Sequence, residues 1–238
     1  MKQFRHRALV ANEIVETERS YSASLAFACE VVITPLRWNA AHATEPILAS
    51  DEIGHIFANL EQVFALSLDL LRQLEARVRA AYNVEGEGEE EEEGAAAGGA
   101  KRPGGGGGGK RAERRQIAIS DIFLFSAPFL KLYKVYCANY NVACDALIRA
   151  RAADSSLWRT FWEQCALHPD FKQSRLEDLL IMPVQRIPRY VLLLRDLIKS
   201  TWPEHSDWDG LHSALKMLEG IALDVNEAMA SNEVSAEM

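Results

Sequence analysis

The sequence predicts an all-α protein, built as an elongated bundle of about six helices. Two observations predict this class. Apolar residues recur at spacings of three and four through most of the 238 residues, which is the period of an amphipathic α-helix. In addition, no run of residues alternates apolar and polar positions with the β-branched side chains that are typical of strands. The chain is long enough for one large domain with a sizeable core.

The expected helices follow from the points at which each apolar stripe starts and stops. Pro35 ends the first stripe, Pro128 breaks the third, and Pro169 follows the fourth. Polar residues that can cap a helix precede the second, third and last stripes. The approximate ranges of the six helices are 4–36, 51–82, 120–152, 157–165, 176–201 and 207–233.

The fifth helix is the most informative. Its second half is apolar around much of its circumference, which predicts a central place in the bundle. Pro183 suits a first helical turn, where its missing N–H has no partner. Pro188 lies further along, so this helix either begins late or bends there. Its polar face is expected to carry Gln185, Arg186, Arg189, Arg195 and Lys199.

Residues 84–115 differ from the rest in composition. They hold an acidic run at 89–93, a glycine run at 104–109 and basic flanks, and their 8 acidic and 6 basic residues contribute −2 to the net charge of −8. A segment with so little apolar surface is expected to be a disordered insertion within one domain. The glycine run does not match a phosphate-binding loop, because no apolar strand precedes it and no Ser or Thr follows Lys110.

The sequence also argues against several classes of protein. The four cysteines lack metal-ligand spacing and are expected to be reduced. No HExxH or GxSxG motif is present. We therefore expect no metal, no cofactor and no covalent chemistry. The net charge of −8 argues against nucleic-acid binding and against a basic membrane-curving face. No apolar run approaches the roughly 18 residues of a membrane span, so we expect a cytoplasmic protein without direct membrane insertion.

Three segments carry a family resemblance, and they occur in that family's order. PVQRIPRYVLLLRDLIKST resembles the third conserved region of the Dbl-homology (DH) domain of Rho-family guanine nucleotide exchange factors. ANEIVETERSYSASL resembles the first region, and ISDIFLFSAPFLKLYKVYCANY resembles the middle one. The resemblance covers residues 8–233 apart from 84–115 and predicts one DH domain at 4–233.

The resemblance implies a protein that binds a Rho-family GTPase, remodels its switch regions and promotes GDP release. Glu13 matches the family glutamate that holds switch I. Arg189 stands at a position that is often lysine in the family and meets switch II. Asn226, in VNE, matches the asparagine of the family's INE, which is also a switch II contact.

Three further positions are assigned to the same GTPase-binding surface. Gln185 and Arg186 are expected there from their helical positions. Ile181 falls where the family tunes its choice among GTPases, and an isoleucine there resembles members active on Rac. A Rac-like partner is therefore weakly favoured, because specificity is distributed over many contacts.

Alternatives remain for the site and for the whole chain. Taken singly, Glu13 could be a solvated charge, Arg189 a surface arginine and Asn226 a packing residue. The fold could also be a catalytically degenerate DH-like scaffold that binds a partner protein. DH domains usually adjoin a pleckstrin-homology (PH) domain, which is not expected within this chain, and regions outside it could recruit the protein to membranes. The charged blocks of 84–115 could dock on the domain and inhibit it.

Overall fold

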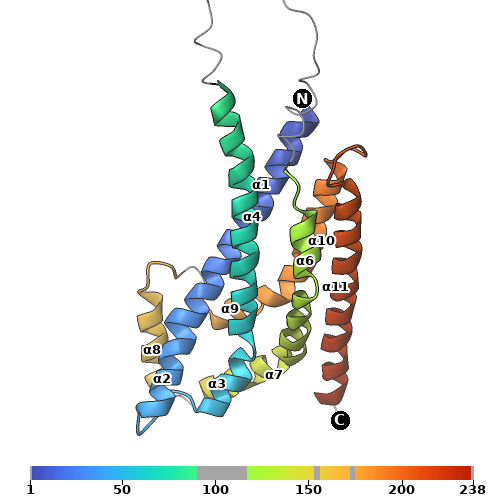
Figure 1. The fold of residues 1–238 in the computed structure, drawn as a ribbon. Coiled ribbons are helices and arrows are strands. Elements are labelled where there is room, and N and C mark those ends of the chain that lie inside the picture. Colours follow the sequence, from blue (N-terminus) through green and yellow to red (C-terminus); the bar gives the residue numbers. More distant parts are fainter. Residues whose placement is uncertain (1, 90–116, 153–155, 172–174, 237–238) are drawn as a thin grey trace, which may run out of the picture.

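The computed structural model describes residues 2–89, 117–152, 156–171 and 175–236, and within these ranges every regular element is helical. The long helices run side by side along one axis (Figure 1). Within the described ranges, no helix combines the length and the apolar character needed to cross a bilayer. The predicted all-α, elongated fold is confirmed.

The first helical rod is longer than the sequence indicates. It comprises α1 (Lys2–Phe27), the π-helical turn η1 (Ala28–Ile33) and α2 (Thr34–His42) without a break. The prediction that Pro35 ends the helix is wrong, because Pro35 lies in the first turn of α2, where a missing N–H is tolerated. The wider π turn precedes it, and the carbonyl of Val31 accepts the thiol of Cys165 at 3.6 Å.

The second predicted helix is two helices. α3 (Ser50–Phe57) ends at Ala58, whose φ of 46° breaks the helical path, and α4 (Leu60–Glu89) begins two residues later. Neither Ser50 nor its neighbour caps α3; instead the carboxylate of Glu52 accepts the backbone N–H of Ala49 at 2.8 Å. Residues 84–89 are helical rather than disordered, and the remainder of the expected insertion lies outside the described residues.

The third stripe is divided at Pro128, as predicted. α6 (Ser120–Ser126) is followed by the 3₁₀ turn η2 (Phe129–Lys131) and by α7 (Leu132–Ala152). The predicted cap at the start of α6 is wrong, because no side chain of its own first turn serves it. Asp207 caps it from a distance by accepting the backbone N–H groups of Ile119 and Ser120 at 3.1 and 3.0 Å.

The remaining helices are α8 (Ser156–Ala166), α9 (Leu176–Leu180), α10 (Met182–Lys199) and α11 (Trp208–Ala236). The fifth predicted helix therefore starts late, because Ile181 ends α9 and precedes α10, with Pro183 in the first turn of α10. Pro188 lies inside α10 on its exposed side.

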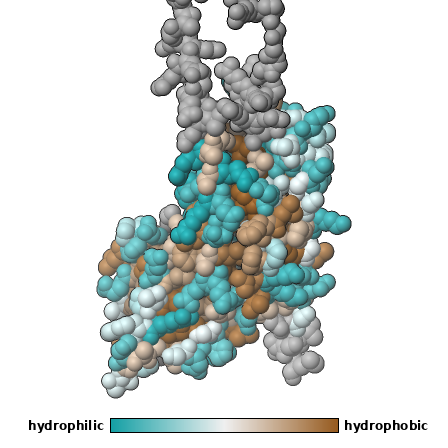
Figure 2. Space-filling view, viewed as in Figure 1, coloured by the Kyte–Doolittle hydropathy of each residue, from teal (hydrophilic) through white to brown (hydrophobic). Residues whose placement is uncertain are grey.

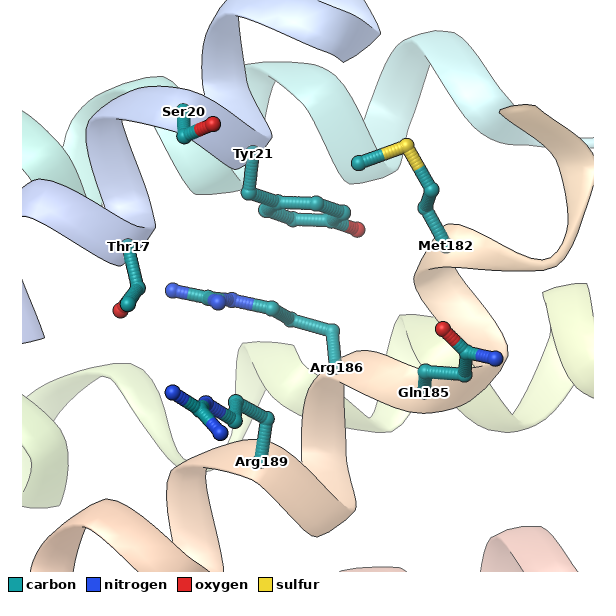
Figure 3. A pocket seen from close by; sticks show the side chains of 7 residues that line it. All are labelled: Thr17, Ser20, Tyr21, Met182, Gln185, Arg186 and Arg189. Carbon is teal, nitrogen blue, oxygen red and sulfur yellow. The ribbon is translucent and has the colours of Figure 1, made fainter. Parts of the chain in front are cut away.

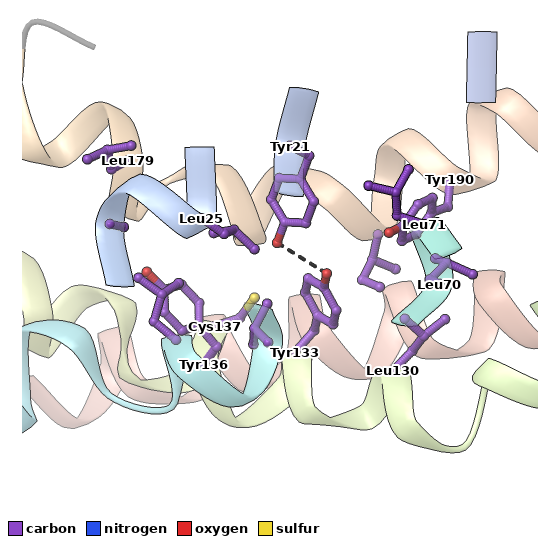
Figure 4. Close-up of a cluster of buried hydrophobic side chains, with 14 of the residues drawn as sticks. Tyr21, Leu25, Leu70, Leu71, Leu130, Tyr133, Tyr136, Cys137, Leu179 and Tyr190 are labelled. Carbon is purple, nitrogen blue, oxygen red and sulfur yellow. Dashed lines mark hydrogen bonds between the residues drawn. The ribbon is translucent and has the colours of Figure 1, made fainter. Parts of the chain in front are cut away.

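The core surrounds α10, as the sequence predicts. Tyr190, Leu194 and Leu197 are fully buried and pack among α1, α7 and α11. Figure 4 shows the centre of this core, where the hydroxyls of Tyr21 and Tyr133 lie 3.1 Å apart within hydrogen-bonding distance. These central positions come from helices distant in sequence, so the described helices share a single core.

The outer surface carries both hydrophilic and hydrophobic residues. In the view of Figure 2 the hydrophobic surface near the middle lies over α6 and the start of α7. Phe125 of α6 and Phe129 of η2 are 63% and 53% exposed, with ring centroids 6.1 Å apart.

Candidate functional site

Glu13 on α1 and Arg189 on α10 meet at the surface of the bundle. Their carboxylate and guanidinium lie 3.1 Å apart, and both side chains are about half exposed, at 53% and 48%. A single contact between two such exposed groups stabilises a protein by no more than about 1 kcal/mol. Both groups are therefore paired yet available to a partner.

A second ion pair fixes where Asn226 lies relative to this one. Arg195 on α10 binds Glu219 on α11 at 2.6 Å, and the two helices run in opposite directions (Figure 1). Arg189 lies six residues before Arg195, and Asn226 lies seven residues after Glu219. At a rise of about 1.5 Å per residue, Asn226 is at nearly the same level along the bundle as Arg189.

Asn226 is exposed, as are Glu13 and Arg189. The structure thus brings three sequence-predicted site residues from three helices to one level of the α1–α10–α11 side of the bundle.

Gln185 lines a hollow between α1 and α10 that adjoins Arg189. The cavity has a volume of about 290 Å³, and Figure 3 shows its walls. Ile181 is half-buried at the break before α10, next to Met182, which also lines the hollow. The full lining is Thr17, Ser20, Tyr21, Met182, Gln185, Arg186 and Arg189.

Arg186 departs from the expectation that it shares the exposed polar face of α10. Its side chain is only 6% exposed, because it points under α1 toward Glu18, whose side chain is fully buried. The guanidinium lies between the rings of Tyr21 and Tyr190, at 4.9 and 4.5 Å from their centroids. Direct contact of Arg186 with a GTPase stays a prediction, and its burial points to a different role.

Sequence reasoning missed Glu18, although a signal for it was present. Glu18 lies four residues after Ile14 and three before Tyr21, so it occupies a core position in the apolar stripe of α1. A carboxylate at such a position needs a buried partner. Thr17, which precedes Glu18 and also fits the spacing of the stripe, is only half-buried.

The phenols around Glu18 are neutral. Burial, followed by the charge of Glu18, raises the pKa of Tyr190 well above its usual value, and burial likewise raises the pKa of Tyr21. The hydroxyl of Tyr190 therefore keeps its proton and donates a hydrogen bond to the carboxylate of Glu18, at 2.6 Å. Among the residues that the structure describes, no group of histidine, cysteine or carboxylate side chains is placed to hold a metal ion.

The chain matches the family model of the RhoGEF domain over residues 10–226. It is 30% identical over 235 residues to Rac guanine nucleotide exchange factor B of Dictyostelium discoideum, covering 95% of this chain and 18% of that protein. It is 28% identical over 221 residues to human spermatogenesis-associated protein 13, covering 93% and 28%. The chain therefore spans less than a third of the length of these relatives.

Solved structures share the fold. The DH domain of FARP2 superposes with a TM-score of 0.69 at 20% identity, covering 97% of this chain and 93% of that one. The DH/PH domains of PDZ-RhoGEF, in a complex with activated RhoA, give a TM-score of 0.72 at 21% identity, covering 98% and 56%. Because the family model covers nearly all of the sequence, this chain belongs to the RhoGEF domain family.

Proposed function

We propose that this chain is a guanine nucleotide exchange factor domain that binds a Rho-family GTPase, remodels its switch regions and promotes GDP release. The observation that carries the proposal is that three exposed residues lie at nearly the same height along the bundle. They are Glu13 on α1, Arg189 on α10 and Asn226 on α11. Each matches a GTPase-binding position of the family motif, and family membership supports the transfer of those roles.

The proposed mechanism uses binding energy alone. Glu13 can accept charge-assisted hydrogen bonds from backbone N–H or hydroxyl groups of switch I and draw that loop away from the nucleotide. Arg189 and Asn226 offer donors to switch II, and Gln185 adds an exposed amide beside them. To speed GDP release about a thousandfold, these contacts must lower the barrier by about 4 kcal/mol.

A GTPase can replace the contact between Glu13 and Arg189 when it binds these two residues. Because both side chains are half exposed, opening their contact costs no more than about 1 kcal/mol. A charge-assisted hydrogen bond to each contributes about 1.5–3 kcal/mol. The exchange of partners is therefore favourable, and each residue keeps a counterpart when the complex forms.

We further propose a preference for Rac-like GTPases. Ile181 stands at the family's specificity position, and several relatives of this chain are named as Rac exchange factors. Its half-buried place beside the hollow would let it contact a bound partner without large rearrangement. The place of action proposed is the cytoplasm, which fits the four free cysteines, and membrane recruitment would depend on regions outside this chain.

Release of a fluorescent GDP analogue from Rho, Rac and Ras-family GTPases tests the proposal. We expect acceleration for Rho-family members, strongest for Rac, and its loss in Glu13→Ala. Glu16→Ala is the matched control, because Glu16 is an exposed glutamate of α1 that pairs with Arg19 instead. A folded chain that binds a Rho-family GTPase without accelerating release would instead be the DH-like scaffold.

A further inference from the structure

We propose that Glu18, Arg186, Tyr190 and Ser67 form a positioning network that sets the spacing of α1 and α10 and so holds Glu13 and Arg189 in register for the GTPase. The inference rests on the proposed function and deepens it. It assigns Arg186 to the support of the binding surface rather than to the surface itself.

The network joins three helices at a single carboxylate. Oε2 of Glu18 accepts Nε of Arg186 at 3.2 Å, Nη2 of the same guanidinium, and the hydroxyl of Tyr190 at 2.6 Å. Oε1 accepts the hydroxyl of Ser67, on α4, at 2.5 Å. Both carboxylate oxygens are therefore occupied, as a fully buried charge requires.

The exposed pair cannot hold the two helices in place by itself. Its single contact joins two half-exposed side chains and so contributes little to stability, and a partner can open it. Breaking the buried pair between Glu18 and Arg186, by contrast, is strongly destabilising, because it leaves an uncompensated charge in the core. The buried contact therefore decides where α1 lies against α10.

The network is close enough to control the pair. Glu18 follows Glu13 by five residues, or about 7.5 Å along α1, and Arg186 and Tyr190 flank Arg189 at three residues before and one after. Arg186 also forms part of the wall between α1 and α10, where its guanidinium lies along the ring of Tyr21 (Figure 3). A shift of Arg186 would change the shape of the hollow between α1 and α10, and it would also change the distance between Glu13 and Arg189.

The molecule contains a chemically matched control. Asp207 is also a fully buried carboxylate, and it pairs with the buried Arg7 of α1 at 2.7 Å. Its partner Arg7 lies six residues, or about 9 Å, before Glu13 on α1, and its other contacts are at the start of α6. The control therefore differs from Glu18 in its distance from the Arg189 end of α10. Thr201, which also contacts Arg7, is twelve residues beyond Arg189, or about 18 Å along the helix direction.

The experiment compares Glu18→Gln with Asp207→Asn. Each removes one buried charge and keeps the shape of the side chain. We measure the stability of both variants by urea unfolding and GDP release from the responsive GTPase, scaled to the folded fraction. We expect both to lose stability but only Glu18→Gln to slow exchange, by about 10–100-fold, because displacement by about 1 Å is enough to cause such a loss.

A double variant separates positioning from stability. Glu18→Gln with Arg186→Met removes the unpaired charge and should recover stability, whereas exchange should stay low because the ion pair between Glu18 and Arg186 of α10 is still absent. Recovery of exchange together with stability would overturn the inference. If Glu18→Gln does not fold, Tyr190→Phe removes one hydrogen bond between α10 and Glu18 and takes its place in the comparison, with the same expected loss of exchange.

A distance measurement on the domain without any GTPase tests the inference independently of the proposed function. Spin labels at Glu16→Cys on α1 and Leu192→Cys on α10, both exposed positions, report the interhelical distance. We expect Glu18→Gln to shift or broaden this distance and Asp207→Asn to leave it unchanged. An unchanged distance in Glu18→Gln contradicts the inference, whereas an inactive wild-type domain whose distance responds as expected contradicts only the proposed function.

Discussion

The carboxylate of Asp207 lies 2.7 Å from the guanidinium of Arg7, although 200 residues separate them in the chain. The same carboxylate accepts the backbone N–H groups of Ile119 and Ser120, and the guanidinium also donates to the hydroxyl of Thr201. Every one of these side chains is buried. One ion pair thus joins the beginnings of α1, α6 and α11.

Arg7→Ala should lower the free energy of unfolding by about 3–5 kcal/mol, because it leaves Asp207 buried without its countercharge. Urea unfolding measures the change. Arg5→Ala is the control, since Arg5 is exposed in the same turn and should have little effect. Equal stabilities for the two variants would show that the pair does not secure the start of α1.

Stability should fall as the pH is lowered from neutral, and His205 is one cause. Burial, reinforced by the charge of Arg7, lowers the pKa of His205 from 6.5 to about 4, and its Nδ1 accepts the N–H of Asp207 at 3.0 Å. The unfolded chain therefore binds a proton at a higher pH than the folded one. The contribution of neutral His205 is complete above about pH 6.5 and is lost as the pH falls toward about 4.

Urea midpoints measured between these pH values check this prediction. His205→Asn offers a side-chain oxygen for the same backbone N–H but has no titrating group. The variant should show a weaker dependence on pH over this window. An identical pH dependence in wild type and variant would assign the acid sensitivity to other groups.

Ala58→Gly should stabilise the domain by about 1 kcal/mol. Ala58 has a φ of 46°, a conformation that costs a residue with a Cβ about 1–2 kcal/mol and a glycine little. Thermal or urea unfolding gives the difference. Ala40→Gly, within the helix α2, is the control of opposite sign, because glycine in a helix interior is destabilising. A loss of stability in Ala58→Gly would contradict the strain described here.

Glu13→Ala and Asn226→Ala should each slow GDP release by about ten- to a hundredfold, since each removes one hydrogen bond to the partner worth about 1.5–3 kcal/mol. Because both residues are exposed, neither change should alter the melting temperature or the helix content. Nucleotide-release assays and circular dichroism together test this. Unfolding in either variant would identify that residue as a packing residue instead.

Exchanging the charges of the exposed pair separates its two roles. In the double variant Glu13→Arg with Arg189→Glu, the ion pair within the free domain can re-form, so stability should match that of wild type. The GTPase, however, would meet a cation where it requires an acceptor and an anion where it requires a donor, so exchange should be lost. Full activity of this variant would show that the two residues serve only each other.

Much of the fold was predictable because the apolar period marks which face of each helix is buried. Tyr190 and Leu197 lie in the core as their spacing indicates. The breaks between helices were harder to predict: alanine is a good helix former, so the residue type of Ala58 gives no sign of its positive φ. The cap of α6 was equally hidden, since Asp207 supplies it from 87 residues away.

For the site, motif matching predicted Glu13, Arg189 and Asn226; all three are exposed, and their roles in binding stay a prediction. Helical position placed Arg186 on the exposed polar face, and its burial contradicts that placement, because helical position alone does not reveal that a guanidinium is directed beneath the neighbouring helix. The partner that directs it there, Glu18, is distant in sequence by 168 residues. Only the tertiary fold pairs two charges so far apart.

The π turn η1 changes which side of the first helical rod faces the core. A π turn contains about one residue more than an α turn, so residues after Ile33 are rotated by about 100° relative to the face they would otherwise continue. One uninterrupted rod can thereby turn its apolar side first toward α4 and α10 and then, with Leu36, toward α3. Deleting a single residue from η1 would aim that second half of the rod at the wrong neighbour while leaving its helical content intact.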